Sequence, residues 1–342
     1  MPNIIIHHRS VHHAQNSGYG RLADYLAGSS LAYHDSKFPY TLAKKAAKLF
    51  DQKAGSYNSI SFVKDYELLK KILLSKKDNG VVHYLNGERD IRLSIALNSY
   101  LPKYKFVASF HKPPEILSNT IRDTKYLKKL DGAIAVGENQ VDFLKNWLNL
   151  ENVKFIPHGV DTVFFKPDES KRKENTLLFV GQHLRDFDAL NYAIPRLKEQ
   201  NPNIRINAVL RKDFANKIVS NDIVTVFSGI DDEKLRTMYR EATLLFLPLK
   251  DCTACNSILE AMACGLPIIS TDVGGNSGYV KNNAGLLLPS NDYKALVDET
   301  ISLLKNNEKQ IEMSNDARQV ALDYEWESVV LRIKEFYDKV ND

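Results

Sequence analysis

The sequence predicts an α/β protein built from two Rossmann-like domains with an interdomain cleft. Short apolar runs typical of buried strands alternate with longer amphipathic segments through both halves of the chain, and this alternation indicates parallel sheets covered by helices on both faces. The chain has 342 residues, which is too long for one ordinary core. A polar stretch without periodicity follows Pro167 and separates the two halves.

The expected elements follow this alternation in order. In the first half we expect strands at 3–7, 59–63, 81–85, 105–110, 132–136 and 153–156, with helices at 19–27, 42–50, 91–99 and 138–147. In the second half we expect strands at 177–181, 204–210, 223–227, 244–247, 267–271 and 285–288, with helices at 186–200, 231–241, 256–264, 293–306 and 308–324. The resulting domains are 1–160 and 176–324, joined by a linker at 161–175, with a C-terminal helix at 325–342 that can pack back on the first domain.

Composition limits the class of protein. Apolar residues make up 44% and charged residues 26% of the chain, and no apolar run approaches the roughly 20 residues that a membrane span requires. The first residues begin a strand and lack the pattern of a signal peptide, so we expect a cytoplasmic protein. Cys252 and Cys255 form a C-x-x-C, but no second pair accompanies it. Packing residues are therefore favoured there over a redox pair or a zinc site.

The net charge of +4 is a weak bias that does not imply nucleic acid. Its distribution is uneven, with nine lysines against three acids between residues 41 and 77. In the expected helix at 42–50, Lys44, Lys45 and Lys48 lie largely opposite an apolar side formed by Leu42, Ala46, Leu49 and Phe50. A basic amphipathic helix can make peripheral contact with an anionic membrane surface. A solvated lysine face is the commoner outcome.

The stretch from Asp251 to Val280 contains the clearest candidate site. A short polar loop leads into a helix that begins near Asn256, and the unpaired amides and dipole of a helix N-terminus attract phosphate. Glu260 lies about one turn into this helix, where a carboxylate can accept hydrogen bonds from a sugar diol. The alternative interpretation is a capping glutamate among ordinary packing residues.

A glycine loop follows the first expected strand and carries Gly18, Tyr19 and Gly20. Such a loop suits close approach by a phosphate or a sugar. A dinucleotide fingerprint is disfavoured because its third glycine and the ribose-binding acid are missing. Nearby histidines could contact substrate, but a metal site is disfavoured since adjacent residues on a strand point to opposite faces. These histidines are His7, His8, His12 and His13.

Polar side chains follow other expected strands, where ligands of such sheets bind. His111 can contact a sugar or serve as a cap, and Arg185 can bind a diphosphate or pair with Asp186 or Asp188. Arg211 is a second candidate cation. The turn from Ser228 to Asp232 can meet a base, although Asp231 also suits an N-cap. The D-x-D of Asp186 and Asp188 could hold a divalent ion, but acids are favoured at a helix start in any case.

These candidates share one expected cleft and suit a nucleoside diphosphate with an attached sugar, bound without a metal ion. The chain resembles the retaining glycosyltransferases of family 4, which have the GT-B fold. The resemblance rests on the segments NSGYGRLADYL (16–26), FVASFH (106–111), IAVGENQVDFL (134–144), VKFIPHGVDTVFFKP (153–167), LLFVGQHLRDFDAL (177–190), VTVFSGIDDEKLRTMYREATLLFLP (224–248) and SILEAMACGLPIISTDVGG (257–275).

The resemblance implies roles for the residues that match. Glu260 resembles the second glutamate of the family's E-x7-E motif, which binds the ribose. His111 resembles the histidine that contacts the donor sugar. Ile230 and Asp232 resemble the base-binding turn.

The chain departs from the family pattern at other positions. The first glutamate of the motif is replaced by Cys252, so Asp251 is the candidate for contact with the sugar hydroxyls. Gln182 replaces the family's arginine, which leaves the phosphate charge to Arg185. His158 and Gly278 replace an asparagine and an acidic residue of the family pattern.

The resemblance implies a retaining glycosyltransferase that uses a nucleoside diphosphate sugar and no cofactor. Arg185 and the backbone from Cys255 to Ser257, including Asn256, would stabilise the departing diphosphate. The acceptor would be a glycan or a lipid-linked hydroxyl. Two alternatives stay open: an epimerase or isomerase on the same scaffold, and a non-catalytic partner subunit of a glycosyltransferase complex.

Overall fold

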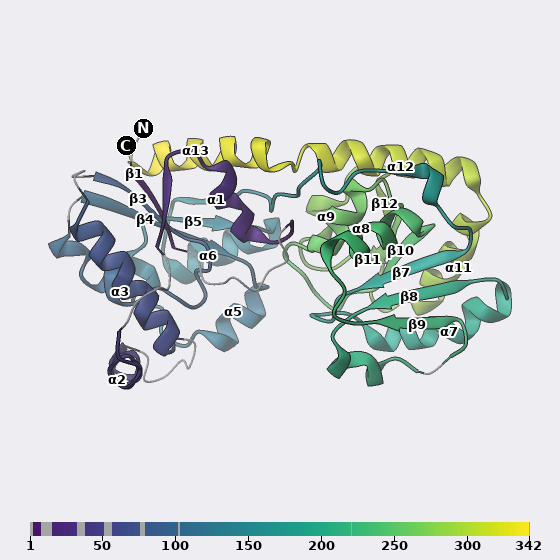
Figure 1. Cartoon of the computed structure of the whole chain (residues 1–342), viewed down its shortest axis with the longest axis horizontal. Helices are drawn as coiled ribbons and strands as arrows, with labels where there is room; N and C mark the ends of the chain where they lie inside the picture. Colours follow the sequence, from purple (N-terminus) through teal and green to yellow (C-terminus); the bar gives the residue numbers. More distant parts are fainter. Residues whose placement is uncertain are drawn as a thin grey trace. The chain divides into compact units, whose positions relative to one another are not determined.

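The computed structural model describes residues 3–7, 16–32, 38–50, 57–75, 79–101, 103–219 and 221–341. The chain forms two compact units, each an α/β assembly (Figure 1). The first unit comprises Met1–His13, Tyr19–Pro157 and Glu327–Asp342, and the second comprises Ala14–Gly18 and His158–Trp326. The expected α/β fold with two parallel sheets is confirmed.

The sheet of the first unit is parallel throughout its described pairings, with the strand order β2-β1-β3-β4-β5-β6. Its strands are β1 (Asn3–His7), β2 (Ser29–Ala32), β3 (Asn79–Tyr84), β4 (Lys103–Phe110), β5 (Gly132–Ala135) and β6 (Val153–Phe155). The direction of winding reverses between β1 and β3. Ligands of open α/β sheets bind at such a reversal, beyond the carboxyl ends of the strands.

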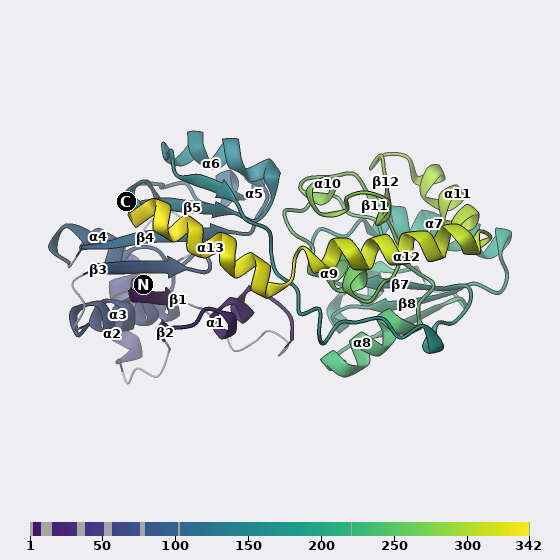
Figure 2. The same cartoon turned by 90° about the horizontal axis from the view of Figure 1, so that it is seen from above.

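The helices of the first unit cover this sheet. They are α1 (Leu22–Tyr25), α2 (Tyr40–Phe50), α3 (Ser59–Leu73), α4 (Leu93–Ala96), α5 (Pro114–Thr120), α6 (Val141–Leu148) and nearly all of α13 (Trp326–Asn341). In Figure 2, α13 lies along the sheet. Phe336 and Val340 of α13 pack so closely on Gly132 of β5 that a Cβ atom there would lie 2.9 Å from each. The glycine therefore permits this contact.

The strand expected at 59–63 is wrong, because these residues form the first turns of α3. The Asn58 side chain accepts hydrogen bonds from the amides of Ile60 and Ser61, both at 3.0 Å, and so caps the helix. Strand β2 was not expected, since its sequence is short and only weakly apolar. It is held by parallel pairing with β1.

The basic helix α2 forms as expected, but its buried side differs from the expected one. Ala43 and Ala47 are buried, whereas Leu42 is 53% and Leu49 74% exposed. The small alanines pack against a cluster with Phe62 and Val63 of α3. The lysines therefore share the exposed surface of α2 with two leucines.

The sheet of the second unit is also parallel in its described pairings, with the order β12-β11-β10-β7-β8-β9. Its strands are β7 (Thr176–Val180), β8 (Arg205–Val209), β9 (Val224–Phe227), β10 (Leu244–Leu247), β11 (Ile268–Thr271) and β12 (Gly285–Leu288). Its helices are α7 (Phe187–Gln200), α8 (Asp232–Glu241), α9 (Asn256–Ala263), α10 (Asn276–Tyr279), α11 (Tyr293–Leu304) and α12 (Asn307–Leu322). The winding reverses between β7 and β10.

The start of the stretch expected as a linker, 161–175, packs on the second unit. The Asp161 side chain accepts a hydrogen bond from the amide of Phe164 at 2.9 Å, and Phe165 is fully buried. Arg318 of α12 donates to the carbonyl oxygens of Thr162 and Phe165. Within the residues that the structure describes, no helix is both long and apolar enough to cross a membrane.

Candidate functional site

The loops that follow β7 and β10 meet where the winding of the second sheet reverses. Arg185 and Leu249 form an antiparallel bridge. The amide of Asp186 donates to the carbonyl of Pro248, and the amide of Lys250 donates to that of Leu184, both at 2.9 Å. These backbone contacts fix the two loops against each other at the position where such sheets bind ligands.

Arg185 is held at this point by three hydrogen bonds. Its Nε donates to the carbonyl of Val180 at 2.7 Å, its Nη1 to the carbonyl of His183, and its Nη2 to the hydroxyl of Ser257 at 3.1 Å. The guanidinium lies over Gly181, where a Cβ atom would come within 2.8 Å of Nη2. The charge is thus fixed at the end of β7, beside the first turn of α9.

The N-terminus of α9 carries no side-chain cap in the described structure. Cys255 stands at the N-cap position, and Asn256 and Ser257 form the first turn. Amides of a first helical turn have no partner within their own helix. Together with the helix dipole and the neighbouring Arg185, these amides make a site suited to an anion.

Glu260 lies one turn further along α9 and is buried. Its Oε1 accepts a hydrogen bond from the Ser17 hydroxyl, and its Oε2 accepts one from the Tyr239 hydroxyl at 2.9 Å. Burial raises the pKa of Glu260 to about 7, against the opposing effect of these two hydrogen bonds. Burial, followed by the charge of Glu260, raises the pKa of Tyr239.

The turn after β9 is bonded to Asn16, the neighbour of the Ser17 that bonds Glu260. Asp232 accepts hydrogen bonds from the amide and the side chain of Asn16, at 2.9 and 3.3 Å. Asp231 caps α8 through the amide of Lys234 at 2.7 Å. Ile230 follows Gly229, whose φ of +68° suits a residue without a Cβ atom.

Arg211 is turned to solvent. Its side chain is 66% exposed and pairs with Asp213. Its amide donates to the Gln182 side chain at 3.4 Å, so Arg211 lies beside the loop after β7 while its guanidinium is engaged by Asp213.

The loop that contains Asp251 and Cys252 is hydrogen-bonded to the glycine pair Gly274 and Gly275. The Asp251 carboxylate accepts a hydrogen bond from the amide of Cys252 at 2.7 Å, and the carbonyl of Cys252 accepts one from the amide of Gly275 at 3.0 Å. The Cys252 thiol lies 2.9 Å from Oδ1 of Asn276, and burial raises its pKa to about 12. Cys252, Cys255 and Cys264 are buried and form no disulfide with one another. Cys252 therefore helps to close the loop through its packing and its contact with Asn276.

The acids of the D-x-D have local partners. Asp186 caps α7 by accepting from the amides of Asp188 and Ala189, both at 3.1 Å. Asp188 pairs with Lys250 at 2.8 Å. Among the described residues, no group of three or more His, Cys, Asp or Glu side chains is arranged to hold a metal ion.

The glycine loop is tied to the first sheet through Tyr19. Gly18 adopts a φ of +88° and lies in the second unit, whereas Tyr19 and Gly20 begin a 3-10 helix in the first. The Ser109 hydroxyl of β4 donates to the Tyr19 hydroxyl at 3.0 Å. Burial raises the pKa of Tyr19. The Tyr19 ring meets the His111 ring edge to face, with 4.7 Å between centroids.

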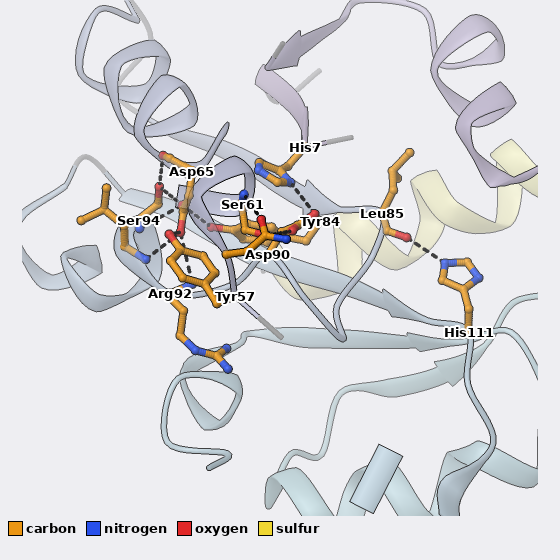
Figure 3. Close-up of polar contacts among 12 residues, drawn as sticks. His7, Tyr57, Ser61, Asp65, Tyr84, Leu85, Asp90, Arg92, Ser94 and His111 are labelled. Atoms are coloured by element: carbon orange, nitrogen blue, oxygen red, sulfur yellow. Dashed lines mark hydrogen bonds and ion pairs between the residues drawn. The ribbon is translucent and has the colours of Figure 1, made fainter. Parts of the chain in front are cut away.

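His111 follows β4, as expected for a strand-end residue. Its Nε2 lies 2.7 Å from the carbonyl oxygen of Leu85. Figure 3 draws this contact as a dashed line. A carbonyl oxygen only accepts, so Nε2 carries the proton. The ring orientation and tautomer are therefore set by the loop that follows β3.

The first unit contains a buried hydrogen-bond network around a carboxylate that was not predicted from the sequence. Asp65 of α3 accepts hydrogen bonds from the hydroxyls of Tyr57, Tyr84 and Ser94 and from the amides of residues 92–94 (Figure 3). It thus caps α4 from another helix. An acid between apolar Val63 and Leu68 in a helix was the available signal.

His7 and Asp90 lie close by, with 3.9 Å between Nδ1 and Oδ2. Burial lowers the pKa of His7, so its imidazole is neutral. The remaining histidines expected near the glycine loop, His8, His12 and His13, lie outside the described residues.

Comparisons with known proteins show which family model, relatives and solved structures this chain resembles. The family model described as "Glycosyl transferases group 1" matches residues 161–320. A human subunit of phosphatidylinositol N-acetylglucosaminyltransferase is 25% identical over 217 residues, which cover 60% of this chain and 44% of that protein. An MMP alpha-(1->4)-mannosyltransferase of Mycolicibacterium hassiacum is 24% identical over 319 residues, covering 88% of this chain and 75% of that one.

Solved structures extend the likeness to the whole fold. A sucrose-phosphate synthase from Thermosynechococcus elongatus superposes with a TM-score of 0.73 at 17% identity, covering 98% of both chains. The chain spans about half the length of the first curated relatives, 44% of the human protein and 50% of its Arabidopsis thaliana counterpart. The family match in the second unit and the likeness in fold show that this chain contains a glycosyl transferases group 1 domain and has the GT-B fold.

Proposed function

We propose that the protein is a retaining glycosyltransferase of family 4 that moves a sugar from a nucleoside diphosphate to an acceptor hydroxyl. One observation carries the proposal. Arg185 is fixed over Gly181 and bonded to Ser257 at the uncapped start of α9, with Glu260 one turn further on. A cation, helix amides and a buried carboxylate in this order suit a diphosphate followed by a ribose.

The leaving diphosphate is where negative charge develops during transfer. In this proposal Arg185 and the amides of Asn256 and Ser257 stabilise that charge, because they are already oriented before the reaction. Glu260 accepts hydrogen bonds from the ribose diol. We assign Ile230, Asp232 and Arg211 to contact with the base. Arg211 is the least supported of the three because its exposed guanidinium is paired with Asp213.

The sugar end of the site is assigned to Asp251 and His111 by family resemblance. The bond from the anomeric carbon to the diphosphate oxygen breaks, and a bond to the acceptor oxygen forms on the same face. The departing phosphate takes the acceptor's proton, so atoms and charge balance without a side-chain base. Gly18, Tyr19 and Gly20 form the loop proposed for the acceptor or the phosphate.

The proposed acceptor is a glycan or a lipid-linked hydroxyl. The human relative's name refers to phosphatidylinositol, and other relatives are named D-inositol 3-phosphate glycosyltransferase. These names favour a polyhydroxylated acceptor that is free or attached to a lipid.

A lipid-linked acceptor would place the protein at a membrane surface, and α2 has a suitable surface. Lys44, Lys45 and Lys48 are exposed beside the exposed Leu42 and Leu49. Lysines attract anionic headgroups and leucines enter the interface. We therefore infer peripheral contact through this helix.

This contact can be measured by co-sedimentation with vesicles that contain an anionic lipid, with neutral vesicles for comparison. Leu49→Glu should abolish binding, while Leu331→Glu, at an exposed leucine of α13, should not. Equal binding by the wild type and the Leu49 variant would contradict the inference.

Metal-independent transfer is proposed because Asp186 and Asp188 are engaged by α7 and by Lys250. In this proposal Arg185 supplies the positive charge that a divalent cation would otherwise provide. Activity that survives exhaustive treatment with a chelator supports this part of the proposal, and activity restored only by a divalent ion contradicts it.

The decisive experiment incubates the protein with a panel of nucleotide sugars, with and without glycan and lipid acceptors. Diphosphate release that depends on acceptor, with a product of retained anomeric configuration by NMR, supports the proposal. Conversion of the nucleotide sugar without acceptor would indicate an epimerase, and binding without turnover would indicate a partner subunit. Glu260→Ala should weaken donor binding and Arg185→Ala should slow transfer.

A further inference from the structure

Glu88 lies in the loop after β3 and reaches the turn that follows β4. Its side chain is 1% exposed. Its Oε1 atom accepts hydrogen bonds from the amides of His111 and of Lys112, the latter at 3.0 Å. One buried carboxylate oxygen thus holds two successive amides at the residue proposed to contact the donor sugar.

Further contacts fix the same two segments to each other. The amide of Gly87 donates to the carbonyl of Ser109 at 2.8 Å, and Nε2 of His111 donates to the carbonyl of Leu85 at 2.7 Å. A Cβ atom at Gly87 would lie 2.9 Å from the Phe110 ring, so the glycine allows this approach. The backbone, the ring orientation and the tautomer of His111 therefore all depend on residues 85–88.

The carboxylate of Glu88 is chemically suited to this task. A single carboxyl oxygen can accept two hydrogen bonds, here from two successive amides, and the amides are left unpaired in a buried place if it is removed. Its Oε2 atom has no hydrogen-bond partner among the described residues. A glutamine could consequently keep both bonds through its carbonyl oxygen while its amide nitrogen takes the place of Oε2.

We propose that Glu88 is a positioning residue that sets the geometry of His111 for contact with the donor sugar. The inference rests on the proposed function, because it assigns Glu88 a part in the same transfer. Glu88 acts through the His111 turn and not on the reacting atoms. Neither the family match, which begins at residue 161, nor the fold comparison assigns it a role.

The test compares Glu88→Ala, Glu88→Gln, His111→Ala and the double variant Glu88→Ala/His111→Ala. Glu88→Ala should lower kcat by about 10- to 100-fold, since small misplacements of a positioned group cost this much. Its affinity for nucleoside diphosphate should stay within about twofold of wild type. Glu88→Gln should keep most of the activity, and the double variant should be no slower than His111→Ala alone.

Asp131→Asn is the matched control. The Asp131 side chain accepts a hydrogen bond from the amide of Phe106 at 2.8 Å, in the middle of β4 and away from His111. This variant should lower thermal stability without a selective loss of kcat. Normal kcat in Glu88→Ala, or a loss that adds to that of His111→Ala, would overturn the proposal. Equal loss in the alanine and glutamine variants would also overturn it, by making the charge itself the essential property.

Nitrogen NMR of the His111 ring separates this inference from the proposed function. Glu88→Ala should change the population of the Nε2-protonated tautomer, and Glu88→Gln should restore it. This result supports positioning even if the wild type transfers no sugar. An unchanged His111 signal in Glu88→Ala overturns the positioning role even if transfer is confirmed.

Discussion

The Ser17 hydroxyl donates a hydrogen bond to Oε1 of Glu260, and Tyr239 occupies the other oxygen of the same carboxylate. Both acceptor atoms proposed for the ribose are therefore engaged within the second unit. A ribose diol offers the same kind of donor as a serine hydroxyl. Binding of the nucleotide would accordingly replace Ser17 at Glu260.

Ser17→Ala should therefore strengthen binding of the nucleoside diphosphate. A hydrogen bond to a charged group contributes about 1.5 kcal/mol, so removal of the competing hydroxyl should lower Kd by about tenfold. Isothermal titration calorimetry measures this. Ser170→Ala, at an exposed serine that bonds Asp168, is the control. Weaker binding by Ser17→Ala would show that the hydroxyl contacts the nucleotide itself.

Stability should depend on pH through Glu260. Its pKa is about 7 in the folded protein, against an ordinary value of 4.5. Between these two values the folded protein keeps the proton that the unfolded chain releases, so the free energy of unfolding falls as the pH rises from 4.5 to 7. Below pH 4.5 and above pH 7, the Glu260 carboxyl adds no pH dependence to the free energy of unfolding. The expected fall is about 3 kcal/mol, since each pKa unit corresponds to about 1.4 kcal/mol.

Glu260→Gln should remove that part of the pH dependence. Urea unfolding of the wild type and the variant between pH 4 and 8 measures it, with Glu335→Gln at an exposed position of α13 as the control. A variant whose stability falls with pH as steeply as that of the wild type would contradict the buried, raised-pKa carboxylate.

The sequence predicts most strands of the two sheets well because apolar runs of strand length mark them. The expected strands at 3–7, 244–247 and 285–288 agree with the structure to the residue. Arg185, Ser257 and Glu260 were all expected at strand or helix ends, and the reversal between β7 and β10 brings them together. Placement at strand ends is a property of the topology, which the alternation of elements already indicates.

Other features depend on contacts between distant segments and leave little signal in the sequence. The run 59–63 is apolar enough for either a strand or a helix, and the cap provided by Asn58 decides for the helix. The roles of Asp65 and Glu88 depend on amides 23 to 29 residues further along the chain. An acid in an apolar stretch suggests burial, but it does not say which amides it accepts from.

Tyr337→Phe should destabilise the first unit. His83 lies buried between the Tyr337 hydroxyl, 2.7 Å from Nδ1, and the Ser109 hydroxyl, 2.8 Å from Nε2. Burial lowers the pKa of His83 to about 3, so the ring is neutral and Nδ1 accepts from Tyr337.

Loss of the hydroxyl leaves a buried acceptor unpaired, which costs about 1 to 3 kcal/mol of unfolding free energy. Denaturant unfolding measures this, and Tyr100→Phe, at a tyrosine that is 84% exposed, should change little. Equal stability of the Tyr337 variant and the wild type would show that the His83 contact contributes nothing net.

Gly274→Ala should impair transfer through the Asp251 loop. Gly274 has a φ of +57°, and a Cβ atom there would lie 2.0 Å from the carbonyl oxygen of Cys252 and 2.5 Å from the Asp251 carboxylate. The Cys252 carbonyl belongs to the backbone and cannot rotate away as a flexible side chain can. The loop must therefore move away from the glycine pair. The proposed sugar contact of Asp251 would move with it, whereas Glu260 on α9 would stay in place.

Gly28→Ala separates this displacement from backbone strain. Gly28 has a φ of +79° with no atom within 4 Å of the added Cβ, so its alanine variant bears only the left-handed backbone cost of about 1 kcal/mol. Steady-state kinetics should show a large loss of kcat in Gly274→Ala with nucleoside diphosphate affinity retained, and near-normal kinetics in Gly28→Ala. Equal kinetics in the two variants would mean that the position of Asp251 does not limit transfer.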